Sequence, residues 1–89
     1  MGRIIYFAPS CDIAVQELGG YERIDGALDS IYQALRVNPF GFPLIENDFT
    51  RARYAKTRPI RDIPALVWLF EIDEHNNVTI LHVEEFLDY

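Results

Sequence analysis

The hydrophobic pattern of this 89-residue chain predicts an α+β fold, with two helices packed on one face of a small, mostly antiparallel sheet. Two observations predict this class. A short β-branched and aromatic run at 4–8 leads into helical periodicity, and the second half holds extended apolar runs separated by turn residues. The predicted order is strand, helix, helix, strand, strand, strand, and the length fits a single domain over residues 1–89.

The N-terminal part begins with the strand at 4–8, which ends at Pro9. A short helix follows through 13–18, and Gly19 ends it, as glycine commonly does at a helix C-terminus. We expect the first strand to join the sheet beside one of the later strands.

The clearest helix is predicted over 21–37, where apolar residues recur at spacings of three and four. The residues on this face are Tyr21, Ile24, Leu28, Ile31 and Leu35. Asn38 and Pro39 end the helix, because the residue before a proline is pushed out of the helical region.

The C-terminal half supplies the remaining strands. Residues 40–49 are irregular, with a short extended piece at 44–45. Residues 50–57 alternate as a strand, which places Arg51, Arg53 and Ala55 on one face and Ala52, Tyr54 and Lys56 on the other. A proline-bounded loop over 58–64 ends this strand.

The final hairpin is predicted from two apolar runs around a turn at 74–77. The first run, at 65–72, is nearly all apolar and reads as a strand buried on both faces. The return strand covers 78–83, and the tail at 84–89 is expected to fold back as a helical turn.

Composition narrows the class of protein. Apolar residues make up 49% and charged residues 25%, which excludes a disordered tail, a collagen-like repeat and a coiled coil. No apolar run reaches the roughly 18 residues that a membrane span needs. The single cysteine forms no internal disulfide, and no His or Cys spacing indicates a metal site. We therefore expect a cytoplasmic protein without membrane contact, metal or other cofactor.

Charge is distributed unevenly. The net charge is −6, yet five of the eight basic residues lie in the window 51–61, and residues 71–89 carry no Lys or Arg. One interpretation is a solvated strand and loop whose charges pair with nearby acids. The other is a binding surface for phosphate or for an acidic partner.

Three stretches resemble the RelE/ParE superfamily of small bacterial toxins. The helix closing at 28–39 (LDSIYQALRVNP) is similar to the family's second helix, and the basic strand at 50–58 is similar to the strand that follows a loop. The hairpin of 67–73 and 78–85 is similar to the family's last hairpin. The resemblance covers nearly the whole chain and specifies the fold better than the activity.

The resemblance implies the toxin of a type II toxin–antitoxin pair, a growth inhibitor neutralised by a cognate antitoxin. Toxins of the ParE branch inhibit DNA gyrase, and those of the RelE branch cut mRNA on the ribosome. If the chain is an enzyme, the resemblance implies a metal-independent mRNA endoribonuclease. The alternative is an inactive or repurposed module of the same fold that only binds a protein partner. The small core also leaves homodimerisation open as a source of stability.

The resemblance also assigns candidate catalytic residues. Arg51, Arg53 and Lys56 lie on the strand where RelE-type toxins hold basic residues, His82 replaces a later arginine, and Tyr89 stands where an aromatic group is common. RNA cleavage by the 2′-hydroxyl needs a base, an acid and cations for the phosphate, and a histidine titrates in the right range.

Three further residues are candidates for partner binding. Arg58 and Arg61 lie in the proline-bounded loop and suit an acidic partner. Tyr54 either stacks on a nucleic-acid base or packs across strands. The chain departs from the RelE pattern because its third strand has no arginine and acids crowd its end, which weakens the ribonuclease interpretation.

Overall fold

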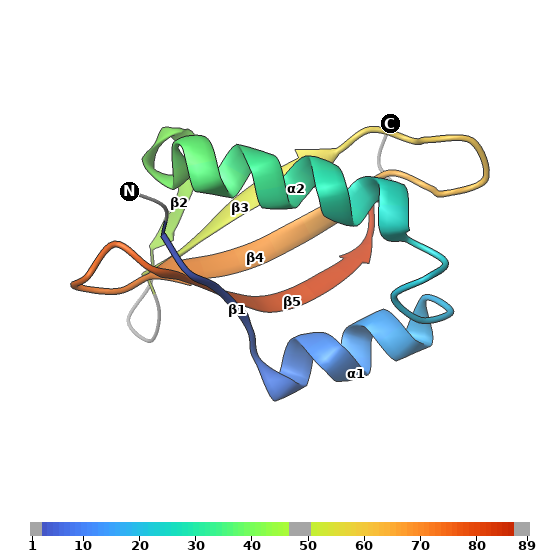
Figure 1. The fold of residues 1–89 in the computed structure, drawn as a ribbon, viewed down its shortest axis with the longest axis horizontal. Coiled ribbons are helices and arrows are strands. Elements are labelled where there is room, and N and C mark those ends of the chain that lie inside the picture. Colours follow the sequence, from blue (N-terminus) through green and yellow to red (C-terminus); the bar gives the residue numbers. More distant parts are fainter. Residues whose placement is uncertain (1–2, 47–50, 87–89) are drawn as a thin grey trace.

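The α+β fold class is confirmed by the computed structural model, which describes residues 3–46 and 51–86. The elements, in chain order, are β1 (Ile5–Phe7), α1 (Pro9–Glu17), α2 (Asp25–Val37), a 3-10 turn η1 (Pro39–Gly41), β2 (Leu44–Glu46), β3 (Arg51–Thr57), β4 (Leu66–Ile72) and β5 (Val78–Glu85). Figure 1 shows α2 lying across the strands and α1 beyond them, next to β5.

The strands form one sheet in the order β1-β5-β4-β3-β2. β1 pairs in parallel with β5, which confirms that the first strand joins a later one, and the other pairs are antiparallel. The predicted order lacks β2, which pairs with β3 from Leu44 opposite Arg53 to Glu46 opposite Arg51. The extended piece predicted at 44–45 lies in this strand, but three residues are too short to show alternation, so its place in the sheet comes only from its pairing with β3.

Strand β4 was predicted to be buried on both faces, and this is wrong. Its buried residues Leu66, Trp68 and Phe70 alternate with the half-buried Val67 and Leu69. Both helices contribute buried residues to one core with the first of these faces. The side chains of the second face are apolar as well, so the sequence alone does not show that no helix covers this face.

Helix α2 begins at Asp25 rather than at the predicted Tyr21. The four residues before it form turns, in which the Arg23 N–H bonds to the Gly20 carbonyl at 3.2 Å. Gly19 and Gly20 have φ of 105° and 99°, values that glycine adopts at little cost. Tyr21 lies outside the helix, where its hydroxyl donates to the Asp12 carboxylate.

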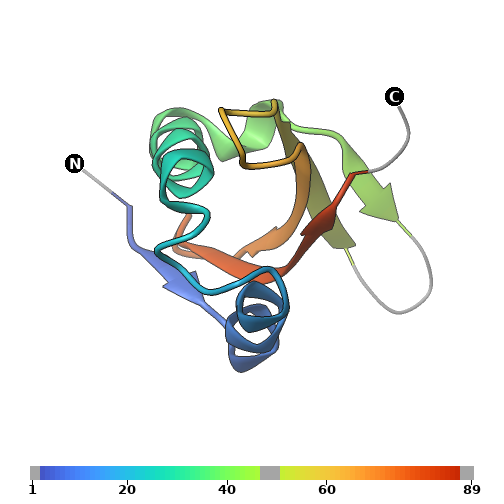
Figure 2. The same ribbon diagram turned by 90° about the vertical axis from the view of Figure 1, so that its right-hand side faces the viewer.

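The loop between β3 and β4 lies beside the first turns of α2 (Figure 2). A Cβ added at Gly26 would lie 3.4 Å from Cδ1 of Ile63, and the next nearest side chain is Ile60. A Cβ would therefore fit here at ordinary contact distance, and because glycine lowers intrinsic helix stability, Gly26→Ala is expected to be tolerated.

The core is centred on the fully buried Trp68. Its indole Nε1 donates to Oγ1 of Thr57, 3.1 Å away on the neighbouring strand. The bond satisfies the only polar atom of the indole, and Thr57 is itself only 8% exposed.

Strand β5 contains a bulge. Phe70 pairs with Ile80 whereas Leu69 pairs with His82, which leaves Leu81 as the extra residue. The Leu81 carbonyl accepts a hydrogen bond from Oγ of Ser10 at 2.5 Å. The bulge therefore keeps Ile80 in the core while turning His82 to the second face.

The end of the chain also differs from the predicted tail. Strand β5 continues to Glu85, so the predicted helical turn at 84–89 is wrong for its first two residues. Residues 87–89 of that prediction lie outside the described residues. Within 3–46 and 51–86, no helix combines the length and the apolar character that crossing a membrane requires.

Burial of Cys11 predicts that stability falls in alkaline solution. Burial, with a smaller contribution from Asp12, raises the pKa of the Cys11 thiol to about 11. The unfolded thiol ionises near pH 8.5, so the folded state holds its proton longer, and the stability present at lower pH is lost as pH rises. Urea unfolding at about pH 7 and about pH 10.5 should show a loss of about 1–2 kcal/mol. The loss should shrink in Cys11→Ala, and an equal loss there would contradict this origin.

Candidate functional site

The candidate site is the sheet face that both helices leave uncovered, named here the open face. Its described residues come from β3, β4 and β5 in two rows across the strands. The rows are Tyr54, Leu69 and His82, followed by Lys56, Val67 and Glu84. None of these residues belongs to the hydrophobic core.

Lys56 is the cation of the open face. Its Nζ lies 4.3 Å from the centre of the Phe86 ring and 5.9 Å from that of Tyr54. The Phe86 N–H donates to the Ala65 carbonyl at 2.8 Å, and this bond fixes the backbone of Phe86 in place. Among the described residues, no carboxylate lies within ion-pair distance of Lys56. The ammonium is thus positioned by aromatic rings and is available to an anion.

His82 is the histidine of the open face. Its Nε2 lies 3.9 Å from Oε2 of Glu84, and 41% of its side chain is exposed. When the imidazole is protonated, the two form an ion pair. The same carboxylate opposes an approaching phosphate, which is the effect expected from the acids near the chain's end.

Arg53 lies on the opposite, helix-covered face, where it pairs with Leu44 on one side and Phe70 on the other. Its Nη1 donates to the Phe42 carbonyl at 2.7 Å and to the Phe40 carbonyl at 3.4 Å. The guanidinium also lies 5.7 Å from the centre of the Phe40 ring. Arg53 therefore holds η1 and the start of β2 against the sheet and does not share a face with Lys56 and His82.

Removing these contacts should lower stability. We expect Arg53→Met to reduce the free energy of unfolding by about 1–3 kcal/mol, because the charged hydrogen bond to Phe42 is lost while the carbonyl stays half-buried. Chemical denaturation measures the change. Arg36→Met is a matched control, because the Arg36 guanidinium lies 5.8 Å from the centre of the exposed Tyr32 ring. An Arg53→Met variant as stable as this control would show that the contacts to η1 do not matter.

The remaining predicted site residues are dispersed. Arg51 opens β3, but its side chain, like all of Tyr89, lies outside the described residues. Arg58 and Arg61 are exposed in the loop, and Arg61 has a φ of 56°. Arg61 lines a pocket of about 440 Å³ together with the acidic Glu22, Asp25 and Asp62. The structure thus brings Tyr54, Lys56 and His82 together and separates them from Arg53 and Arg61.

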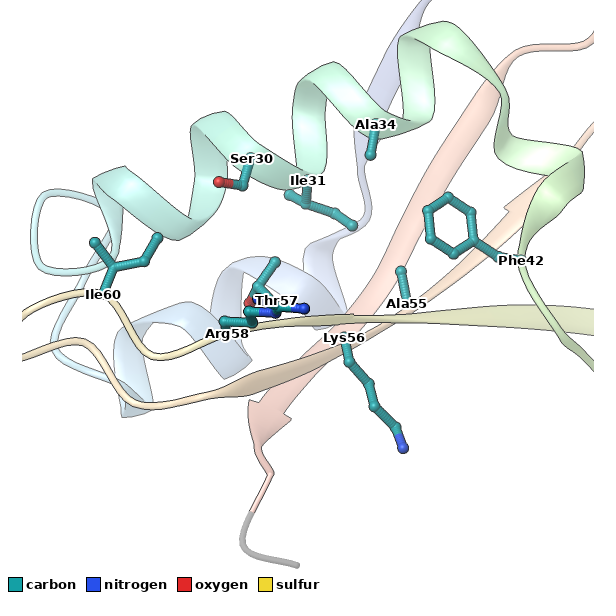
Figure 3. A pocket seen from close by; sticks show the side chains of 9 residues that line it. All are labelled: Ser30, Ile31, Ala34, Phe42, Ala55, Lys56, Thr57, Arg58 and Ile60. Carbon is teal, nitrogen blue, oxygen red and sulfur yellow. The ribbon is translucent and has the colours of Figure 1, made fainter. Parts of the chain in front are cut away.

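Sequence reasoning missed two pockets that flank the end of β3. One of about 400 Å³ lies between α2 and β3, and its apolar lining includes Ile31, Ala34 and Phe42 (Figure 3). The other, of about 540 Å³, is lined by residues that include Pro59, Ala65 and Phe86. No sequence signal indicates them, because each is lined by residues far apart in the chain, such as Ile31 with Ala55 and Lys56 with Phe86.

No described group of three or more His, Cys, Asp or Glu side chains is arranged to hold a metal ion. The chemistry that the open face offers is that of its own side chains. A cation, a histidine and a tyrosine can contact a phosphate, transfer a proton and stack on a base, respectively.

Comparison with known proteins identifies the fold. No protein-family model and no curated protein sequence matches the chain. A solved structure does match: a chain of the toxin–antitoxin complex RelBE2 from Mycobacterium tuberculosis. The TM-score is 0.71 at 15% identity, over 97% of this chain and all of that one. The chain therefore has the fold that its RelE/ParE resemblance implies, shared with a component of a toxin–antitoxin complex.

Proposed function

We propose that this protein is the toxin of a type II toxin–antitoxin pair, which inhibits growth in the cytoplasm by binding a cellular target and is neutralised by a partner protein. The observation that carries the proposal is the full-length likeness to a chain of the RelBE2 complex. The open face supports it, because it exposes Lys56 and His82 beside the half-buried apolar Val67 and Leu69. A surface of this composition suits contact with a macromolecule.

Two targets fit the open face to different degrees. Cleavage of ribosome-bound mRNA would use Lys56 to hold the phosphate and His82 to transfer a proton. Two observations weaken the case for mRNA cleavage. Glu84 places negative charge beside His82, and Arg53 donates to a backbone carbonyl on the other face of the sheet. Binding to DNA gyrase requires no such catalytic set, so neither Glu84 nor the position of Arg53 counts against this target.

A protein-binding module without toxicity is the second candidate. It is favoured by the carboxylate of Glu84 beside His82, which suits neither phosphate binding nor nucleic-acid approach. The fold and the open face would then serve contact with a partner protein alone.

The deciding experiment is tightly controlled induction of the chain alone in bacteria. We expect growth arrest, and rescue when the protein encoded beside it is co-expressed. Primer extension on cellular mRNA then detects cleavage, and a supercoiling assay with purified gyrase detects inhibition. Normal growth in cells that hold the soluble, folded protein would overturn the toxin proposal and leave the binding module.

A further inference from the structure

We propose that the uncovered edge of β3, over residues 54–58, takes up an extended acidic segment of a partner protein as an additional strand of the sheet. The inference rests on the proposed function only in identifying this partner as the neutralising protein. It adds where that partner binds and in what conformation.

The edge has backbone groups without a strand partner. Pairing with β2 ends at Leu44 opposite Arg53, and beyond it the Tyr54 N–H still bonds to the Pro43 carbonyl at 3.1 Å. Hydrogen-bonding directions alternate along a strand, so the N–H and C=O of Lys56 point to the same edge as those of Tyr54. In the described part of the chain, no strand pairs with Lys56 on that side. Such an edge is a template for pairing with another chain.

One pocket beside this edge matches the side chains of an added strand. Lys56, Thr57 and Arg58 line the pocket of about 400 Å³ between α2 and β3, whereas the pocket of about 540 Å³ extends to Ala65 and Phe86 on the β4 side of β3. Successive side chains of a strand point to opposite faces of the sheet. Alternate residues of an added segment would therefore enter the pocket on the α2 side, and backbone bonds would supply affinity while this apolar pocket supplies specificity.

Charge identifies the occupant. Lys56 and Arg58 are exposed, and among the described residues neither has a carboxylate within ion-pair distance. A second copy of this chain would bring like charges together across the new pair of strands, which is destabilising. A segment with apolar residues flanked by Asp or Glu fits both the pocket on the α2 side and the charges.

A lysine on an edge strand can instead serve to block pairing. Here the Lys56 side chain points away from α2 and lies over the Phe86 ring, with Nζ 4.3 Å from the ring centre (Figure 3). It is therefore drawn onto the open face and leaves the backbone of the edge accessible. By the same alternation the next outward N–H belongs to Ile60, and it bonds to the Ile63 carbonyl at 2.9 Å, so the available edge ends at Arg58.

The test uses the purified chain and a panel of synthetic peptides with three apolar residues, Val, Leu, Ile or Phe, between acidic pairs. Two-dimensional amide NMR should show saturable shifts centred on Lys56 and Arg58. Methylating the backbone nitrogens of the bound peptide that face the edge should weaken binding about tenfold, because the hydrogen-bond donors are lost. Absence of shifts at Lys56 with the whole panel, or equal binding of the methylated peptide, would overturn the proposal.

A pair of variants separates backbone from charge. Lys56→Ala removes only the ammonium and should weaken binding a few-fold, whereas Lys56→Pro also removes the outward N–H and should weaken it about tenfold more. Equal binding by the two variants, with folding checked by the amide spectra, would contradict strand addition. Amide exchange at Lys56 that slows as protein concentration rises, without peptide, would assign the edge to a second copy instead.

The proposed function and this proposal fail separately. If the peptide binds at Lys56 but the chain leaves growth unaffected, the toxin proposal fails and strand addition at the β3 edge stands. If the chain arrests growth but no peptide binds at Lys56, the toxin proposal stands and strand addition fails.

Discussion

Bacteria induced to make the variant with Lys56 and His82 both changed to alanine will keep growing, whereas the wild-type chain will arrest them. The two residues are the cation and the histidine among the described residues of the open face. Their loss removes the charged contacts to a phosphate or to an acidic surface, each worth about 1–3 kcal/mol. Colony counts after induction measure the effect, which should reach several orders of magnitude.

The matched control changes a cation and a histidine that lie elsewhere. Arg23 and His75 make exposed pairs with Asp62 and Glu74 and contribute nothing to the open face. The Arg23→Ala, His75→Ala variant should arrest growth as the wild type does. If the Lys56 and His82 variant stayed fully toxic at equal protein level, the open face would not be the surface that meets the target.

The chain with Trp68 changed to alanine will lose about 3–5 kcal/mol of unfolding free energy. Trp68 is fully buried at the centre of the sheet, where it pairs with Ala55 and Val83. A domain of this size has a margin of only about 5–10 kcal/mol, so the substitution removes between about a third and all of it. Urea unfolding, followed by far-ultraviolet circular dichroism, measures the loss.

Two conservative variants divide this effect between packing and hydrogen bonding. Trp68→Phe removes part of the buried volume and the indole N–H, whereas Thr57→Val keeps the indole and leaves its N–H without a partner. We expect losses of about 1–3 kcal/mol from Thr57→Val, from the unsatisfied donor alone. A neutral Thr57→Val would show that the 3.1 Å bond contributes nothing net.

The elements that carry their own periodicity could be predicted from the sequence. Helix α2 repeats apolar residues at helical spacing, and the alternation in β3 correctly separates Arg53 from Lys56. An extended piece was predicted at 44–45, but its place in the sheet could not be, because a three-residue strand has no pattern and acquires its identity from pairing with Arg51–Arg53. The predicted helix start at Tyr21 was wrong, because residues 21–24 form turns after two glycines with positive φ.

The candidate site was harder to predict because a strand pattern does not say which face the helices cover. Arg53 and Lys56 were grouped by charge, yet packing sends one to the carbonyls of η1 and the other to the ring of Phe86. The catalytic roles of Arg51, Lys56, His82 and Tyr89 stay predictions. The uncovered edge of β3 at 54–58 had no sequence signature, since it arises because β2 is shorter than β3.

The bulge at Leu81 has a consequence for comparing this chain with distant relatives. Removing Leu81 would restore a regular ladder in which His82 still faces Leu69 and Val83 still faces Trp68. A relative one residue shorter at this point would present the same side chains to both faces. An alignment gap therefore belongs at Leu81, and a gap placed elsewhere in β5 would exchange core positions with those of the open face.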